Sequence, residues 1–504
     1  MKTALVCLLA AVWAVCLPTA AAESSEKLLD EWHVIYLNGQ KAGHEHATGW
    51  RFEGDQGAIY ETVTQQEFTI QRGPFRLAFT SENVIREGAD GRVRSFTAHQ
   101  KQGPVTQHTE GHLENGQMVL ETTVGAATTT KRIEPPSGLG PHALRRLRGE
   151  KGFEPGTTYS VTVFLAEFPA RGVKMDCRVG PPEQREVGGR MRTLHPIHAT
   201  LDILPGLRAT EWVDDQNRTW LTRAPLSGSL MLETRRADED AASAENRPTD
   251  LLEASVLLPD RPIERPRETE RVRLLLVPAS GNVQVPDLPT GPFQTVKRTD
   301  RGVEVSVRRA HPSPEGGYEL PYEDDAYEAF LRPNRWLETE EPIIVEMSRQ
   351  AVGDAEDALA AAQRIEEYVS VHIARKTLAL GMATAAQTAR QKEGDCTEHA
   401  MLTAALARAA GIPARVVEGL AYVPDHRGGI FGYHMWTEAY VGEWLPLDAA
   451  LGGHDATHLV LARSDLNEPG SLAGVWGMMR YFGTFEIRVL EVTHDPSEPQ
   501  KQAG

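Results

Sequence analysis

The sequence of 504 residues is poor in cysteine, with four in all. Cys7 and Cys16 lie near its start, so Cys177 and Cys396 are the two in the body of the chain. Two cysteines cannot form the dense disulfide framework that stabilises small secreted domains. The sequence leaves two alternatives open, one bridge between Cys177 and Cys396 or two free thiols.

The chain is also short of basic residues. It has 53 Lys and Arg against 70 Asp and Glu, which gives a net charge of −17. Such an acidic surface repels phosphate backbones and anionic headgroups, so nucleic acid is a poor candidate partner. The content of 40% hydrophobic and 24% charged residues is typical of globular proteins. The length predicts about two to four domains.

Long apolar runs are absent after the N-terminus, so no membrane span is expected there. At the N-terminus, Lys2 precedes an apolar run from Ala4 to Leu17, and three alanines ending at Ala22 precede Glu23. This pattern is typical of a cleaved secretory signal peptide. We therefore expect residues 1–22 to be removed by cleavage after Ala22, and the mature protein to be periplasmic or secreted.

Short alternating apolar runs separated by turn sequences dominate residues 23–236. Asn38-Gly39 and Asn115-Gly116 are two of these turn sequences, and the pattern predicts an antiparallel β-rich domain. A polar linker is expected at 237–250. A small β segment is expected at 251–311, where Val303, Val305 and Val307 alternate with polar residues.

Helical spacing appears after this segment, so residues 312–490 are predicted to form an α+β domain and residues 491–504 a polar tail. Helices are expected at 354–373, at 384–391 and from Cys396 to about Ala410. Strands are expected at 415–422, 434–441 and 444–447. The fold class is thus multi-domain α+β, with an antiparallel β-rich region first and an α+β domain after it.

Cys396 is the first candidate for chemistry, because it follows Gly394-Asp395 and opens a predicted helix. The positive end of a helix stabilises a thiolate, which is the reactive form of cysteine. The backbone N–H groups of the first turn can also hold the oxyanion that forms when a thiolate attacks a carbonyl. Gly394 is expected to permit a tight turn before the nucleophile.

His434 and Asp448 supply the two groups that a cysteine nucleophile needs. His434 is predicted to open a strand and to act as the base. Asp448 ends the next strand, after the turn at Gly442-Glu443. Antiparallel pairing of the two strands would bring Asp448 beside His434, where a carboxylate fixes the orientation of the imidazole.

Four segments together resemble the transglutaminase-like superfamily, over about residues 331–451. They are Glu393–Ala400 (EGDCTEHA), Arg408–Arg415 (RAAGIPAR), Tyr433–Glu438 (YHMWTE) and Trp444–Asp448 (WLPLD). The resemblance implies a papain-like triad of Cys396, His434 and Asp448, placed on a helix and on strands in that order.

This resemblance implies a cysteine-dependent acyl-transfer enzyme that acts on a protein or peptide substrate through a thioester, with water or an amine as acceptor. The alternative is a non-catalytic envelope binding or assembly module that keeps the fold. No cofactor or metal is expected, because the histidine groups at His44/His46, His195/His198 and His454/Asp455/His458 each lack a complete ligand set. These histidines are expected to be exposed on strands or loops.

Overall fold

A computed structural model describes most of the chain. The described residues are 25–54, 57–73, 75–102, 105–124, 127–203, 208–225, 230–248, 250, 256–279, 285–312, 317–378, 383–425, 427–466, 481 and 483–494. The signal peptide predicted at 1–22 lies outside them. Within these ranges, no helix has the length and apolar character needed to cross a membrane.

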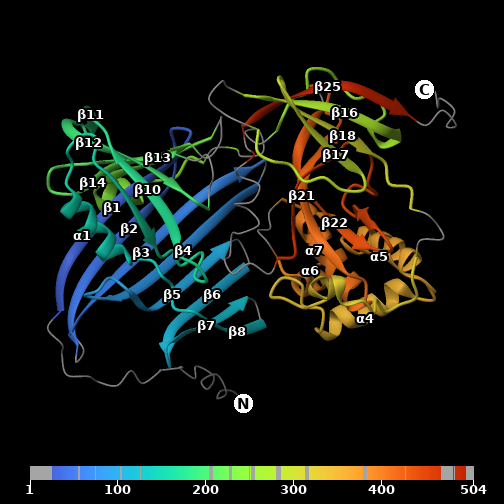
Figure 1. The fold of residues 1–504 in the computed structure, drawn as a ribbon, viewed down its shortest axis with the longest axis horizontal. Helices are drawn as coiled ribbons and strands as arrows, with labels where there is room; N and C mark the ends of the chain where they lie inside the picture. The colour runs from blue at the N-terminus through green and yellow to red at the C-terminus, as the bar shows by residue number, and fades with distance from the viewer. Residues whose placement is uncertain are drawn as a thin grey trace, which may run out of the picture.

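A large, curved antiparallel sheet forms one half of the described molecule (Figure 1). Its strands follow the order β8-β7-β6-β5-β4-β3-β2-β1-β15-β14-β13-β12-β10-β9, and β11 pairs with β12. The β-rich prediction for this region is therefore confirmed. The strands are β1 Ser25–Leu37, β2 Gln40–Gly54, β3 Gly57–Arg72, β4 Phe75–Gly88, β5 Val93–Gln102, β6 Val105–Glu114, β7 Gln117–Val124, β8 Ala127–Ile133, β9 Thr158–Val163, β10 Val173–Val179, β11 Glu183–Val187, β12 Arg190–Leu201, β13 Arg208–Val213, β14 Thr219–Pro225 and β15 Met231–Ala237.

Two-residue turns set the register of the long hairpins. Asn38 and Gly39 join β1 to β2 with φ values of 49° and 77°. Asn115 and Gly116 join β6 to β7 with φ values of 51° and 83°. Both residues of each turn are left-handed, as the type I′ turn requires, and this turn matches the twist of paired strands. Local sequence therefore determines how these strands pair.

Helix α1 (Pro141–Lys151) packs against the sheet and is capped by a strand residue. Its N-cap, Gly140, has no side chain that could accept a hydrogen bond. Glu87 of β4 supplies the acceptor instead, because its carboxylate receives the N–H groups of His142 (3.1 Å) and Ala143 (2.7 Å). Burial raises the pKa of Glu87 to about 7.

A short helix lies inside the predicted linker at 237–250. Helix α2 (Glu239–Ser243) starts at Asp238, whose side chain accepts the N–H of Ala241 at 2.8 Å. Lys41 Nζ of β2 donates to the carbonyl of Ala242 at 2.8 Å. These contacts hold the segment against the sheet.

A second sheet has the order β17-β18-β16-β25. Its strands are β16 Thr269–Pro278, β17 Gln294–Thr299, β18 Gly302–Arg308 and β25 Phe485–His494, and the 3-10 turn η1 Pro266–Glu268 precedes β16. Strand β25 lies beside β16 although more than 200 residues separate them in sequence (Figure 1). The predicted boundary at residue 490 falls inside β25.

The part of the chain between β18 and β25 carries helices and a third sheet, of order β23-β22-β21-β24. The predicted helices and strands are all present, and α4 was not predicted. The elements are η2 Asp325–Phe330, α4 Pro342–Val352, α5 Ala358–His372, β19 Arg375–Lys376, α6 Ala385–Gln391, β20 Glu393–Gly394, α7 Cys396–Ala409, β21 Ala414–Val423, β22 Ile430–Tyr440, β23 Trp444–Leu447 and β24 His458–Ser464. This α+β region follows the antiparallel sheet, which confirms the fold class.

Two apolar clusters contain residues from different parts of β21 and β22. Val416, Met435 and Ala439 pack with the buried sides of the helices. Leu420 and Phe431 pack instead with the inner face of the second sheet. Strands β21 and β22 therefore link the helices to the second sheet and form a rigid base for the side chains they carry.

Candidate active site

Helix α7 begins at Cys396 because its N-terminus carries a reciprocal cap. The Asp395 side chain accepts the N–H of Thr397 at 2.8 Å, and the Glu398 side chain accepts the N–H of Asp395 at 2.8 Å. This capping box fixes where the helix starts. It places Cys396 at the first helical position, with its thiol partly accessible.

Gly394 has a different role from the one predicted. Its φ is not in the left-handed region, so no tight turn requires glycine there. A Cβ at this position would lie 2.4 Å from Cβ of Glu398. Gly394 is therefore needed because the buried Glu398 side chain packs directly on the backbone before the nucleophile.

The same cap limits which amides can bind an oxyanion. The carboxylate of Asp395 takes the backbone N–H groups of Thr397 and Glu398. The prediction that all backbone N–H groups of the first turn can bind the oxyanion is therefore too broad. Cys396 N–H is the first-turn amide that the cap does not use, and it lies beside the thiol sulfur.

His434 and Asp448 meet as the strand pairing predicts. Strand β23 pairs with β22, and Leu447 opposite Thr437 is the last pair. Asp448, the next residue, therefore lies beside the part of β22 that precedes Thr437. His434 Nε2 lies 2.7 Å from Asp448 Oδ2. His434 does not open β22, which begins four residues earlier at Ile430 because pairing with β21 extends to Val423.

The thiol of Cys396 is within hydrogen-bonding reach of His434. Because Asp448 occupies Nε2, the ring nitrogen left for the thiol is Nδ1. Burial alone would lower the pKa of His434, but the charge of Asp448 and the neighbouring Cys396 raise it to about 9. The three residues predicted from the sequence are thus brought together, and the His434 imidazole is protonated near neutral pH.

A buried histidine that was expected to be exposed extends this group, together with a buried aspartate. His458 is fully buried, and its Nε2 lies 2.9 Å from the same Asp448 Oδ2 that contacts His434. Its Nδ1 lies 3.2 Å from Asp455 Oδ1. The prediction that this histidine is exposed is therefore wrong, because the turn after Asp448 brings His458 back beneath strand β22. The spacing Asp448…Asp455-x-x-His458 was the available sequence signal.

Glu366 of α5 also supports the site. Its Oε1 accepts the backbone N–H of Asp448 at 2.5 Å. Burial, together with the charge of Asp448, raises the pKa of Glu366 to about 7. This contact could not be predicted from the sequence, because Glu366 is one of many acidic residues in the chain.

His434, Asp448 and His458 form the group of potential metal ligands found among the described residues, with ligand atoms within 4.8 Å of one another. Both Nε2 atoms, however, lie at hydrogen-bond distance from the same carboxylate oxygen. We interpret the group as hydrogen-bonded side chains, since these contacts account for its spacing.

Cys177 is remote from this chemistry. Cys177 and Cys396 are both free thiols, so the alternative of a bridge between them is wrong. Cys177 is buried in β10, where it packs with Val179, Ile197 and Val213. Burial raises the pKa of the Cys177 thiol.

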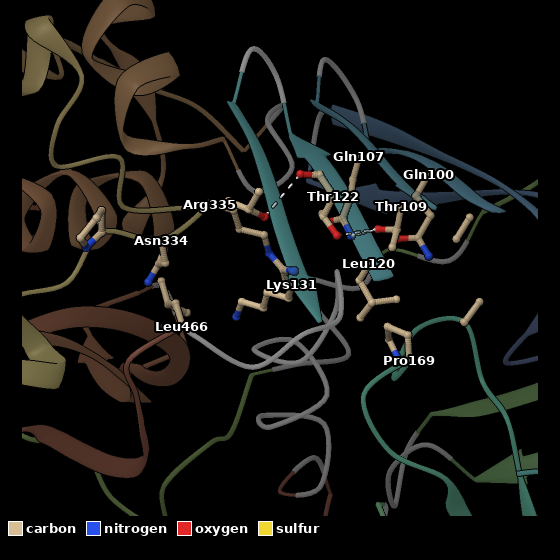
Figure 2. Close-up of a pocket in the computed structure, with 14 residues that line it drawn as sticks. Gln100, Gln107, Thr109, Leu120, Thr122, Lys131, Pro169, Asn334, Arg335 and Leu466 are labelled. Carbon is tan, nitrogen blue, oxygen red and sulfur yellow. Dashed lines mark hydrogen bonds between the residues drawn. The ribbon is translucent and has the colours of Figure 1, made fainter. Parts of the chain in front are cut away.

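A separate hollow lies between the large sheet and the helical region (Figure 2). Its volume is about 120 Å³, and polar side chains of β5 to β8 face Asn334 and Arg335 across it. Burial lowers the pKa of Arg335 to about 10. Cys396, His434 and Asp448 do not line this hollow. It is therefore distinct from the candidate active site.

Comparison with known proteins identifies one family. The profile of the transglutaminase-like superfamily matches residues 345–449, which include Cys396, His434 and Asp448. No curated protein matches the chain.

Several solved structures are similar in part. A candidate cysteine protease from Cytophaga hutchinsonii is 15% identical with a TM-score of 0.32, over 46% of this chain and 93% of that one. A β-barrel-like protein of unknown function from Brucella abortus is 14% identical with a TM-score of 0.30, over 42% and 97%. A candidate protease from Parabacteroides distasonis is 12% identical with a TM-score of 0.19, over 70% and 68%. These scores are too low to carry an argument.

Proposed function

We propose that this chain, whose residues 345–449 form a transglutaminase-like domain, is an exported cysteine-dependent acyl-transfer enzyme that acts on peptide or amide bonds. The observation that carries the proposal is the contact of Cys396, at the start of α7, with His434, which Asp448 holds from the other side. A thiol, a base and a carboxylate in this order are the parts of a nucleophilic triad.

The chemistry proceeds in two halves. The Cys396 sulfur, its proton held by His434, attacks the carbonyl carbon, and a C–S bond forms while charge moves to the carbonyl oxygen. Cys396 N–H is placed to stabilise that oxygen. Collapse breaks the C–N bond, and His434 gives its proton to the departing amine. The thioester is then attacked by water or an amine, which loses its proton to His434 as the C–S bond breaks.

The pKa of His434 supports this division of roles. An imidazole that is protonated near neutral pH has a proton to donate to the leaving nitrogen. Asp448 is fully buried, and its contacts with His434 and His458 keep its pKa well below the usual range despite burial. It therefore stays negative at the pH where the enzyme would work.

Reaction with iodoacetamide, followed by mass mapping of the labelled peptide, tests the proposal. Cys396 of the full mature chain should be labelled selectively near pH 6, well below the ordinary thiol range of about 8.5. Replacement of His434 by Gln should abolish this selectivity. Cys396→Ala should remove turnover of amide substrates, whereas Cys177→Ala is the matched control that should retain it. Full turnover by Cys396→Ala would exclude the mechanism.

Export is tested separately. The first residue of the mature protein, recovered from the envelope or medium of an expressing bacterium, should be Glu23. A protein that retains Met1 in the cytoplasm would contradict this part of the proposal.

A further inference from the structure

The Asp448 carboxylate is shared between two histidines. Its Oδ2 lies 2.7 Å from Nε2 of His434 and 2.9 Å from Nε2 of His458. Its Oδ1 accepts the N–H groups of Ala450 (2.9 Å) and Leu451 (3.1 Å). The triad accounts for one of these histidines and leaves His458 without an assigned role.

The opposite side of His458 faces a second carboxylate. Nδ1 lies 3.2 Å from Asp455 Oδ1, which also accepts the hydroxyl of Thr457 at 2.5 Å. Asp455 Oδ2 pairs with Arg267 of η1, and Arg267 donates in turn to the carbonyl of Tyr422 at 3.1 Å. The second carboxylate is thus fully engaged and is held by Arg267 of η1, the turn that precedes β16.

A fully buried imidazole with a carboxylate at each nitrogen is best satisfied as a cation. A neutral ring can donate from one nitrogen only, whereas the cation donates from both. The N–H of Asp455 also approaches Nδ1, but at the longer distance of 3.3 Å. In agreement, and against the effect of burial, Asp448 and Asp455 raise the pKa of His458 to about 9.

We propose that His458 is a positioning residue of the active site, held as a cation between Asp448 and Asp455, that directs the Asp448 carboxylate at His434 and limits how tightly His434 keeps its proton. The proposal rests on the proposed function of the triad. A second positive charge on the same oxygen weakens the attraction between Asp448 and the His434 proton. His434 can then release that proton to the leaving amine.

Other charged or titratable groups face this pair from several elements. Cys396 of α7 contacts His434, and Glu366 of α5 accepts the Asp448 N–H. Lys376 of β19 donates to the carbonyl of Ala450 at 2.6 Å. His454 lies with its ring 4.7 Å from that of His458. Burial, together with the charge of His458, holds the pKa of His454 well below its usual range, so it adds no charge.

The test is the pH dependence of Cys396 alkylation by iodoacetate in the full mature chain. Iodoacetate is an anion, so its reaction with the thiolate slows when the neighbouring imidazolium loses its charge, and this alkaline limit reports loss of the His434 proton. His458→Gln keeps a hydrogen-bond donor and removes the charge, so this limit should move up by about one pH unit, with the two rings 5.9 Å apart. Asp455→Asn should move it in the same direction, because it destabilises the His458 cation.

Asp448→Asn should shift the alkaline limit in the opposite direction. It removes the charge that holds the His434 proton, so the alkaline limit should move down. The control is His33→Gln, since His33 is buried in β1 of the large sheet, outside the site. A residue that only stabilises the fold would change the amount of reactive protein and leave the pH limit in place.

The outcomes separate the two proposals. If Asp448→Asn moves the limit and His458→Gln leaves it unchanged, His458 has no positioning role and the inference is overturned. Labelling that is lost on chelation and restored by zinc would also overturn it. Absence of selective Cys396 labelling in the unmodified chain would instead contradict the proposed function itself.

Discussion

At the scale of single residues, the site is a row of alternating charges buried below one accessible thiol. Cys396 contacts His434, Asp448 lies between His434 and His458, and Asp455 follows on the far side. Each charged side chain has an opposite partner, which is the condition for burying charge at low cost. Removal of any one member leaves its neighbour buried without a partner.

This row makes stability depend on pH. The folded pKa values of His434 and His458 are about 9, above the ordinary value of 6.5. Their contribution is therefore complete below pH 6.5 and is lost as pH rises through 9. We expect the free energy of unfolding, measured by urea titration, to fall between pH 6.5 and pH 9.5 by about 3 kcal/mol for each of the two histidines.

The variant His458→Gln provides the check on this expectation. It lacks one of the two groups, so its stability should change less over the same pH interval. An equally steep loss in His458→Gln would show that other groups cause the dependence. At acid pH the stability depends on pH in the opposite direction. The pKa of Asp448 is lower in the folded than in the unfolded state, so ionised Asp448 stabilises the fold above its unfolded pKa. This contribution is lost as pH falls and Asp448 is protonated.

At the scale of elements, the helix and the strands of the site are positioned by contacts with each other. Thr437 Oγ1 of β22 donates to the carbonyl of Ala400 in α7 at 2.8 Å. Tyr422 of β21 receives the N–H of Ile263 on its hydroxyl at 2.9 Å. Strand β25 closes the second sheet against this base, with Phe485 and Ile487 in the shared core.

Strand β25 should therefore be essential for stability although it lies far from the thiol in sequence. Phe485 is buried in the core, whereas Leu490 on the same strand is exposed. Phe485→Ala should lower the free energy of unfolding by about 3–5 kcal/mol. Leu490→Ala, the matched control, should change it by less than about 0.5 kcal/mol. Equal effects in urea titrations would mean that the strand is not packed as described.

At the scale of the whole molecule, the large sheet and the helical region are in direct contact. Val124 of β7 is fully buried in the same apolar cluster as Trp336 and Leu337, which precede α4. The hollow of Figure 2 lies along this contact. We predict that the sheet recruits a substrate or shields the active site.

Val124→Asp tests this contact. Burial of a carboxylate in an apolar cluster should cost about 3 kcal/mol or more and separate the two parts. Limited proteolysis between them should become faster, while iodoacetamide should still label Cys396 selectively. Thr123→Asp, on the less buried side of β7, is the control. If Val124→Asp abolishes selective labelling while the domain stays folded, the sheet would be needed to organise the site itself.

The local elements and the meeting of the three candidate residues could be predicted from the sequence alone. The type I′ turns at Asn38-Gly39 and Asn115-Gly116 depend on two residues each, and helix α7 depends on the cap at Asp395. Strand alternation and the short turn before Trp444 were enough to predict that Asp448 returns to His434. These features are predictable because each depends on residues close together in the chain.

The remaining features could not be predicted from the sequence, because they depend on contacts between residues that are distant in the chain. Pairing of β25 with β16 joins the end of the chain to the second sheet. Burial of His458 between Asp448 and Asp455, with Arg267 paired to Asp455, joins the site to η1, the turn that precedes that sheet. The sequence does not show whether a histidine is buried, and the charge of a buried histidine depends on the partners that the fold brings to it.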